Sequence, residues 1–375
     1  MRDHFVPFEL ERIMSIWENQ VEYNLSESGV HPMTTAELLD ENPDLSSQLL
    51  QIELNYPQTN GTLELRTNIA NLYPGATNEN VVATTGAAQA NFTSILTVLD
   101  PGDQIAVLLP NYMQIWGIAK NLQLDIRTFS LREELGWGLD LDELNRAVTD
   151  KTRLIAVCNP NNPTGYIMSA EEMNAVVAAA DRVGAWLLAD EVYAGAEHNT
   201  DIVTPSFYGK YDKVLAMGSL SKAYGLPGLR IGWVATTKDM AAEIWARQDY
   251  VTICTTMLGN WLGAYALSYD VRPRILERTR NYVRRGYRNF ANWCEENAGL
   301  ISLVPPQAAA IGFVRYHREI NSTQLVKQLV EKKMTYVVPG DHFGLDHHLR
   351  ISYGLSNTYV NEGLRRLTDL LISVE

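Results

Sequence analysis

The feature that most constrains the fold is a regular alternation of short apolar runs with amphipathic helical patterns, from about residue 80 to residue 235. Near-continuous apolar strands separated by helices are typical of a mostly parallel sheet that helices cover on both faces. The sequence therefore predicts an α/β fold with a mostly parallel seven-stranded sheet. The runs expected as strands are Asn80–Thr84, Gln104–Leu109, Leu124–Phe129, Arg153–Cys158, Trp186–Ala189, Lys213–Met217 and Ile231–Ala235.

The pattern changes after about residue 270, where a long charged helix is expected over Arg272–Glu296, followed by shorter strands and a final helix over Val360–Val374. We expect residues 271–375 to form a small α+β domain beside a large domain, residues 46–270. Residues 1–45 include an amphipathic segment that is too short to fold alone, so we expect this segment to pack on the body of the protein.

The charge balance limits the classes of partner. The chain has 31 Lys and Arg against 44 Asp and Glu, a formal net charge of −13, which argues against nucleic acid. The acidity fits either a cationic substrate or a well-solvated surface. Cys158, Cys254 and Cys294 are widely and irregularly spaced, so neither a disulfide framework nor a metal site is expected. No apolar stretch has the length of a signal peptide or a membrane span, so we expect a cytoplasmic protein without a membrane partner.

Polar and small residues follow four of the expected strands, and ligands of parallel α/β sheets bind outside the carboxyl ends of the strands. Gly86 leads into a helix whose first N–H groups could hold an anion. Two prolines and a glycine fix the turn Asn159–Gly165, Asp190 ends an apolar strand, and Lys222 lies among hydroxyl-bearing and small residues. Taken singly, Gly86 and the turn Asn159–Gly165 also fit ordinary tight turns. Asp190 also fits a helix cap, and Lys222 also fits a surface lysine. The glycine patterns of Rossmann dinucleotide sites and of P-loops are absent at Gly86.

Together, and in this order, the four stretches resemble the fold-type I pyridoxal 5′-phosphate (PLP) enzymes of the class I/II aminotransferase family, over roughly residues 50 to 370. The resemblance implies that Lys222 holds PLP as a Schiff base and then moves the substrate's α-proton. It implies that Asp190 pairs with the ring nitrogen, which keeps the ring an electron sink. Tyr193 and Asn162 match the partners of the ring's 3-hydroxyl, Asn162 also facing the substrate, and Tyr112 matches an aromatic residue that stacks on the ring.

The same resemblance implies the rest of the site. Arg350 matches the arginine that binds the substrate α-carboxylate, for which a forked guanidinium is well shaped. Tyr56 matches a residue that reaches the phosphate of the neighbouring subunit, so a homodimer with shared active sites is implied. The groups expected around the phosphate are Gly86, Ala87, Ala88, Ser219, Ser221 and Arg230.

The resemblance also implies that residues 46–270 bind PLP and that residues 1–45 pack over the active site. Within this N-terminal segment, the stretch Trp17–Pro32 indicates the reaction. It is similar to that of the dioxygen-using PLP enzymes that hydroxylate or desaturate free L-arginine through a quinonoid intermediate, and less closely similar to that of the cyclases of the capreomycidine synthase kind. A guanidinium needs carboxylates in forked contact, and Glu18 and Glu27 are available. His31 matches the histidine of the oxidases and could move protons. Oxidation of a cationic L-amino acid, most simply L-arginine, is therefore the predicted reaction.

Several alternatives stay open. Ordinary transamination to a 2-oxo acid is the commonest outcome on this fold, and a cyclase is a second alternative. Glu18 and Glu22 are four residues apart and also fit a solvated helix face, while a lone histidine in a turn is usually structural. An effector-sensing module without catalysis is remote, since every ligand position is filled.

Overall fold

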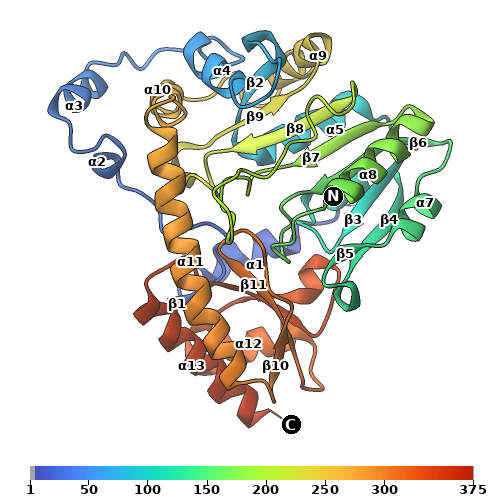
Figure 1. Ribbon diagram of the computed structural model, residues 1–375, viewed down its shortest axis with the longest axis vertical. Helices are drawn as coiled ribbons and strands as arrows, with labels where there is room; N and C mark the ends of the chain where they lie inside the picture. The colour runs from blue at the N-terminus through green and yellow to red at the C-terminus, as the bar shows by residue number, and fades with distance from the viewer. Residues whose placement is uncertain (1–4, 375) are drawn as a thin grey trace.

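The computed structural model describes residues 5–374 and contains the predicted large sheet (Figure 1). Residues 1–4 and 375, which belong to the predicted first and last segments, lie outside the described residues. The sheet has eight strands in the order β2-β9-β8-β7-β6-β3-β4-β5, and the seven predicted runs are seven of them. The eighth, β5, is a two-residue strand, too short for the hydrophobic pattern to predict. The bounds are β2 Val81–Thr85, β3 Gln104–Leu109, β4 Asp125–Arg132, β5 Gly138–Leu139, β6 Thr152–Cys158, β7 Trp186–Asp190, β8 Val214–Ser219 and β9 Ile231–Ala235.

The strands between β4 and β8 pair in parallel, whereas β9 pairs antiparallel with both β8 and β2. Successive residues of β7 illustrate why helices are needed on both faces. Leu187 and Ala189 join one hydrophobic cluster, whereas Leu188 joins the other. The mostly parallel α/β fold is thus confirmed. The helices whose residues pack on the first face are α4 Leu63–Ala70, α7 Leu141–Ala147, α8 Ala170–Val183 and α10 Met257–Ala266; those on the second are α5 Gly86–Val98, α6 Gln114–Asn121 and α9 Lys238–Gln248.

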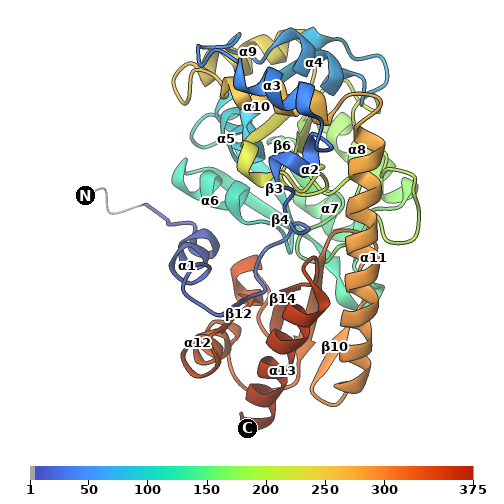
Figure 2. The same ribbon diagram turned by 90° about the vertical axis from the view of Figure 1, so that its left-hand side faces the viewer.

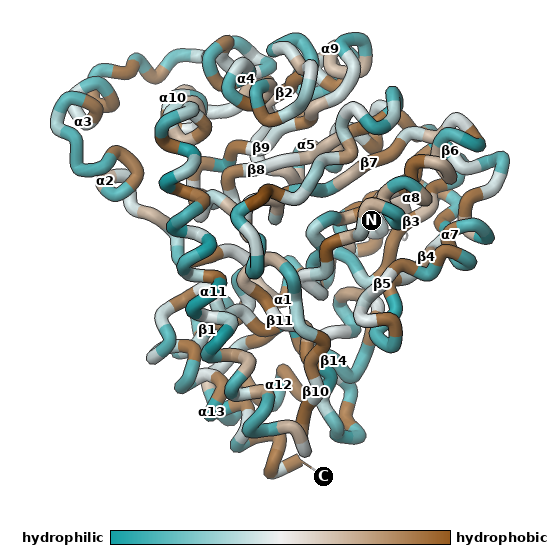
Figure 3. The backbone as a smooth tube through the Cα atoms, viewed as in Figure 1, coloured by the Kyte–Doolittle hydropathy of each residue, from teal (hydrophilic) through white to brown (hydrophobic). Residues whose placement is uncertain are grey.

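A second, antiparallel sheet with the order β10-β11-β14-β13 lies below the first in Figure 1. The long helix α11, Arg272–Glu296, runs beside both sheets and has the bounds that the sequence predicts. Hydrophilic and hydrophobic stretches alternate along it (Figure 3), as expected of a helix with one buried face. The remaining elements of this part are β10 Ile301–Leu303, β11 Ile311–Tyr316, α12 Ser322–Lys333, β12 Thr335–Tyr336, β13 Val338–Pro339, β14 His348–Ser352 and α13 Asn357–Ser373.

The N-terminal segment crosses between the two sheets. Helix α1, Glu9–Trp17, lies between α6 and α12 in Figure 2, and β1, Tyr23–Asn24, pairs in parallel with β12. Two short helices, α2 Thr35–Leu38 and α3 Pro43–Leu50, then lead to the large sheet. The segment therefore borders the carboxyl ends of the large sheet's strands. No helix within residues 5–374 is both long enough and apolar enough to cross a membrane.

Candidate active site

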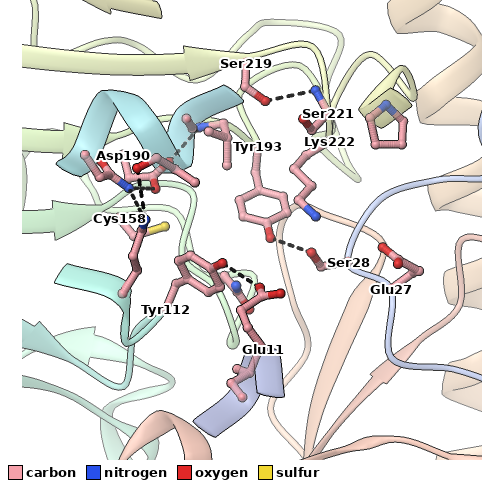
Figure 4. Close-up of a pocket in the computed structure, with 18 of the residues that line it drawn as sticks. Glu11, Glu27, Ser28, Tyr112, Cys158, Asp190, Tyr193, Ser219, Ser221 and Lys222 are labelled. Carbon is pink, nitrogen blue, oxygen red and sulfur yellow. Dashed lines mark hydrogen bonds between the residues drawn. The ribbon is translucent and has the colours of Figure 1, made fainter. Parts of the chain in front are cut away.

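A cavity of about 510 Å³ lies where the carboxyl ends of the parallel strands meet α1, the segment after β1 and strand β14 (Figure 4). Thirteen of the sequence-predicted residues line it, although they come from widely separated parts of the chain. They are Glu18, Glu27, Ala87, Ala88, Tyr112, Asn162, Asp190, Tyr193, Ser219, Ser221, Lys222, Arg230 and Arg350. The fold thus brings the four motifs and the two N-terminal acids to one place.

Three predicted residues do not line this cavity. Gly86 lies directly behind it, at the first position of α5. Tyr56 is 82% exposed, which leaves it free to contact another subunit. His31 is exposed as well; its ring lies beside Tyr282, with the ring centroids 6.3 Å apart. The predicted proton-transfer role of His31 therefore has no support from its position in a single chain.

Lys222 lies in the loop after β8. The last residue of that strand is Ser219, whose hydroxyl oxygen accepts a hydrogen bond of 2.9 Å from the Ser221 N–H. The Lys222 amine points into the cavity in Figure 4. Burial lowers the pKa of this amine, because a low-polarity surrounding disfavours the ammonium form. A larger neutral fraction makes Lys222 a better nucleophile.

Asp190 ends β7, and its side chain is buried at the floor of the cavity. Its carboxylate accepts hydrogen bonds from the Val192 N–H, at 3.3 Å, and from the Asn91 amide, at 3.4 Å. Burial raises the pKa of Asp190. It forms no ion pair with a cationic side chain of residues 5–374, so the carboxylate fits a protonated ring nitrogen as its partner.

Arg350, on β14, is also buried, and it faces the cavity from the small sheet. One guanidinium nitrogen donates to the Asn162 side-chain oxygen at 3.0 Å, and another donates to the Ser26 carbonyl. Its Nε is buried without a partner in the described part of the chain. A guanidinium held at two points, with donor capacity to spare, suits a carboxylate ligand.

A cradle of small residues completes the floor. Gly86 has φ +75°, and a Cβ there would lie 2.4 Å from the Arg230 guanidinium. A Cβ on Gly232, in the neighbouring strand, would lie 2.4 Å from the Ala87 backbone nitrogen. The absence of these side chains leaves the first N–H groups of α5 and Arg230 side by side, an arrangement that fits a phosphate.

Comparison with known proteins decides the family. The model of the family "Aminotransferase class I and II" matches residues 22–367. The chain belongs to this family.

Two relatives and two solved structures give the range of similarity. Capreomycidine synthase of Streptomyces vinaceus is 29% identical over 94% of this chain and 90% of its own length. An aspartate aminotransferase of Streptomyces avermitilis is 28% identical over 78% of this chain and 74% of its own length. A PLP-dependent aminotransferase from Streptococcus suis superposes with a TM-score of 0.92 at 30% identity, covering 100% of this chain and 99% of the other. The PLP-dependent cyclase OrfR superposes with a TM-score of 0.88 at 24% identity, covering 98% of this chain and 97% of the other. At this identity the similarity shows the fold alone.

As in other members of this family, the cofactor is PLP and the substrate of the enzyme is an amino acid. The residues present fit PLP on three structural grounds: a desolvated lysine, a buried carboxylate without a cation among residues 5–374, and the helix N–H groups beside the Arg230 guanidinium, which suit a phosphate. Lys222, Asp190 and the Gly86–Arg230 cradle would hold the aldehyde end, the ring nitrogen and the phosphate of PLP, respectively. The Tyr193 hydroxyl, which donates to Ser28 Oγ at 2.9 Å, lies between Lys222 and Tyr112 in Figure 4.

Sequence reasoning missed four polar residues of the cavity: Glu11, Ser28, Asn91 and Gln114. Asn91 lies in the middle of α5, where no motif marks it, and it reaches Asp190 only because α5 packs beside the sheet. Glu11 could have been found from its spacing, because it precedes Glu18 by seven residues and thus shares its helix face. Ser28 had no signal of its own.

Proposed function

We propose that this aminotransferase-family enzyme acts on a free cationic L-amino acid, with L-arginine as the first candidate, and that the reaction is transamination. The observation that carries the substrate class is the gathering of Glu11, Glu18 and Glu27 in the cavity that also holds Lys222 and Arg350. None of the three acids takes part in an ion pair within residues 5–374.

The electrostatics support a cationic ligand. Burial, Glu27 and Glu11 all raise the pKa of Glu18, because negative charge is crowded there. A guanidinium or ammonium group bound among these acids would relieve the repulsion. Arg350 would meet the substrate's α-carboxylate across the cavity. The two ends of the proposed substrate are thus recognised by opposite charges.

The chain's own groups have separate tasks in this proposal. PLP, when bound, withdraws electrons from the bonds of the substrate's α-carbon. Lys222 takes the α-proton and returns one at a neighbouring position, work for which its lowered pKa suits it. Asp190 holds a proton on the ring nitrogen. Tyr112, Glu27 and Ser28 line the cavity on the N-terminal side, where they would limit the access of water.

Transamination needs no further catalytic group, which is why we assign it. A cyclase is the second candidate, because the similarity to capreomycidine synthase extends over 94% of the chain. Oxidation by dioxygen stays a prediction from the N-terminal resemblance. Its distinguishing residue, His31, is exposed and does not line the cavity, so we place this reaction third.

A homodimer, typical of this family, is also proposed here. Leu50, Leu54 and Tyr56 are 80–82% exposed, and large apolar side chains grouped on one segment favour a protein contact. Sedimentation of the PLP-loaded protein should give about twice the chain mass. A monomer at micromolar concentration would contradict the shared active site implied for Tyr56.

The reaction is tested by mixing the PLP-loaded protein with L-arginine and a 2-oxo acid in an oxygen electrode, with products followed by mass spectrometry. We expect formation of the amino acid derived from the 2-oxo acid, without oxygen uptake and without turnover by K222A. Oxygen uptake would favour the oxidase instead. A cyclic product in a parallel reaction with a hydroxylated arginine would favour the cyclase, and inertness towards every cationic amino acid would refute the substrate class.

A further inference from the structure

Glu11 occupies a special place among the cavity acids. It lies on α1, one position after the buried Leu10 and three before the buried Met14, which fix the helix against the body. Glu11 and Glu18 are about two turns apart, so both side chains reach the cavity. Glu9, on the same helix, is exposed and does not line it.

The Glu11 carboxylate is joined to Tyr112. The Tyr112 hydroxyl donates to Glu11 Oε1 at 2.6 Å, a short charge-assisted bond, and the dashed line in Figure 4 marks it. Phe8, also from the N-terminal segment, meets the Tyr112 ring edge-on with the ring centroids 5.0 Å apart. Helix α1 thus holds in place the aromatic ring that is predicted to stack on PLP.

This arrangement leaves Glu11 with capacity to bind a second donor. A carboxylate has two oxygens and about four acceptor positions. Within residues 5–374, the only hydrogen bond to the Glu11 side chain comes from Tyr112 at Oε1. Glu11 can therefore accept from a guanidinium without releasing Tyr112.

We propose that Glu11 determines specificity for the substrate's cationic side chain by bridging that side chain to Tyr112. Glu11 is the one acid of the three that contacts both the cavity and the aromatic residue. A cation bound at Glu11 neutralises charge beside Glu18 and strengthens the placement of Tyr112, whereas a neutral side chain does neither. The assignment goes beyond the proposed function but rests on it, because it presupposes a cationic amino acid.

The test compares L-arginine with L-citrulline, which has nearly the same shape but no side-chain charge, in wild type, E11Q, Y112F and the double variant. We expect E11Q to lower kcat/KM for L-arginine about 10–100-fold and to leave the value for L-citrulline within about twofold, because one charge-assisted contact is lost. The exposed Glu9 provides the matched control, and E9Q should retain the wild-type ratio.

Two readouts separate a bridge from a structural role. In the double-mutant cycle, the effects of E11Q and Y112F on L-arginine should be clearly less than additive, because the Tyr112 hydroxyl acts on the cation only through the Glu11 carboxylate, whose charge E11Q removes. Calorimetric titration of the PLP-free protein should show E11Q weakening L-arginine binding about tenfold or more, without activity being involved. Equal losses of kcat/KM for L-arginine and L-citrulline in E11Q would show that the contact is merely structural. Additive effects of E11Q and Y112F would refute the proposed bridge.

Failure of this assignment can be told from failure of the proposed function. If wild type prefers L-arginine and E11Q keeps that preference, the role of Glu11 is refuted while the substrate class stands. If wild type itself does not distinguish L-arginine from L-citrulline, the substrate class is refuted, and the assignment falls with it.

Discussion

Asn91 and Asp190 come from different elements and meet at the floor of the cavity, where the Asn91 amide nitrogen lies 3.4 Å from an Asp190 carboxylate oxygen. Asn91 also donates to the Gln114 side-chain oxygen at 3.2 Å, so α5, α6 and β7 are joined at this point. A neutral amide holds the carboxylate in position without neutralising it. The charge of Asp190 therefore stays available for the ring nitrogen of PLP.

The first prediction concerns D190N, which should stabilise the PLP-free protein and impair the PLP-loaded enzyme. Asparagine keeps the acceptor for the Val192 N–H and removes a buried charge that has no cationic partner, a gain of about 1–2 kcal/mol that outweighs the loss of the long 3.4 Å hydrogen bond from the Asn91 amide. Activity should fall about 10–100-fold, because the ring nitrogen loses its ionic partner. Thermal unfolding and initial rates measure the two effects. D181N, at an exposed position, should change neither. A less stable PLP-free D190N would contradict our account of Asp190.

The second prediction uses two glycines with the same φ of +75°. G86A and G75A should each lose about 1–2 kcal/mol of stability from left-handed backbone strain. Only G86A should also weaken PLP binding, about tenfold or more, since its Cβ would lie 2.4 Å from the Arg230 guanidinium while Gly75 has open space around it. Fluorescence titration with PLP distinguishes the two variants. Equal PLP affinities would show that Arg230 does not hold the phosphate.

The third prediction is a pH dependence due to Glu191. Burial, above all, raises its pKa from 4.5 to about 8, although Ser206 and the Phe207 N–H donate to the same carboxylate oxygen. Between pH 4.5 and 8 the folded protein therefore holds a proton that the unfolded chain has released. The contribution of Glu191 to the free energy of unfolding is complete below pH 4.5 and is lost as the pH rises to about 8.

E191Q keeps the acceptor oxygen and removes the titration, so its stability should fall less with pH than that of wild type. The difference in slope is at most about 1.4 kcal/mol per pH unit. Urea unfolding at pH 5.5 and pH 8 measures it. E171Q, at an exposed position of α8, should follow wild type. A wild-type stability that rises relative to E191Q over this range would show that the sign is wrong.

The fourth prediction concerns R350K, which should raise KM for the amino acid about 10–100-fold and leave PLP absorbance unchanged. Lysine provides a point charge and cannot hold Asn162 and the Ser26 carbonyl while also presenting a fork to a carboxylate. Steady-state kinetics and visible spectra test this. R315K, at an exposed position of the neighbouring strand β11, serves as the control. An unchanged KM would place carboxylate recognition elsewhere.

The fifth prediction concerns H31A. Because His31 is exposed and packs beside Tyr282 outside the cavity, transamination rates of H31A should stay within about twofold of wild type. Oxygen uptake measured alongside gives a second readout. A large change in product or in oxygen use would favour the dioxygen-dependent oxidation over transamination.

Much of the site was predictable because parallel strands bring their carboxyl ends to one edge. Asp190 and Lys222 each follow an apolar run, so their proximity follows from the strand pattern before any contact is known. Arg350 was identified only through a family resemblance, since it reaches the cavity from a different sheet. Glu11, Ser28 and Asn91 were missed because long-range packing, rather than a local pattern, brings them there.

The α/β sheet and the order of its strands along the chain could be inferred from local periodicity, and the groups proposed to bind PLP from motifs next to strand ends that resemble those of a known family. Which further side chains share the cavity with them depends on tertiary packing. That packing turned α1 so that Glu11 contacts Tyr112, and it left His31 on the surface. The physical reason is that the position of an N-terminal segment depends on which apolar surface it buries, and the spacing of its own residues does not specify that surface.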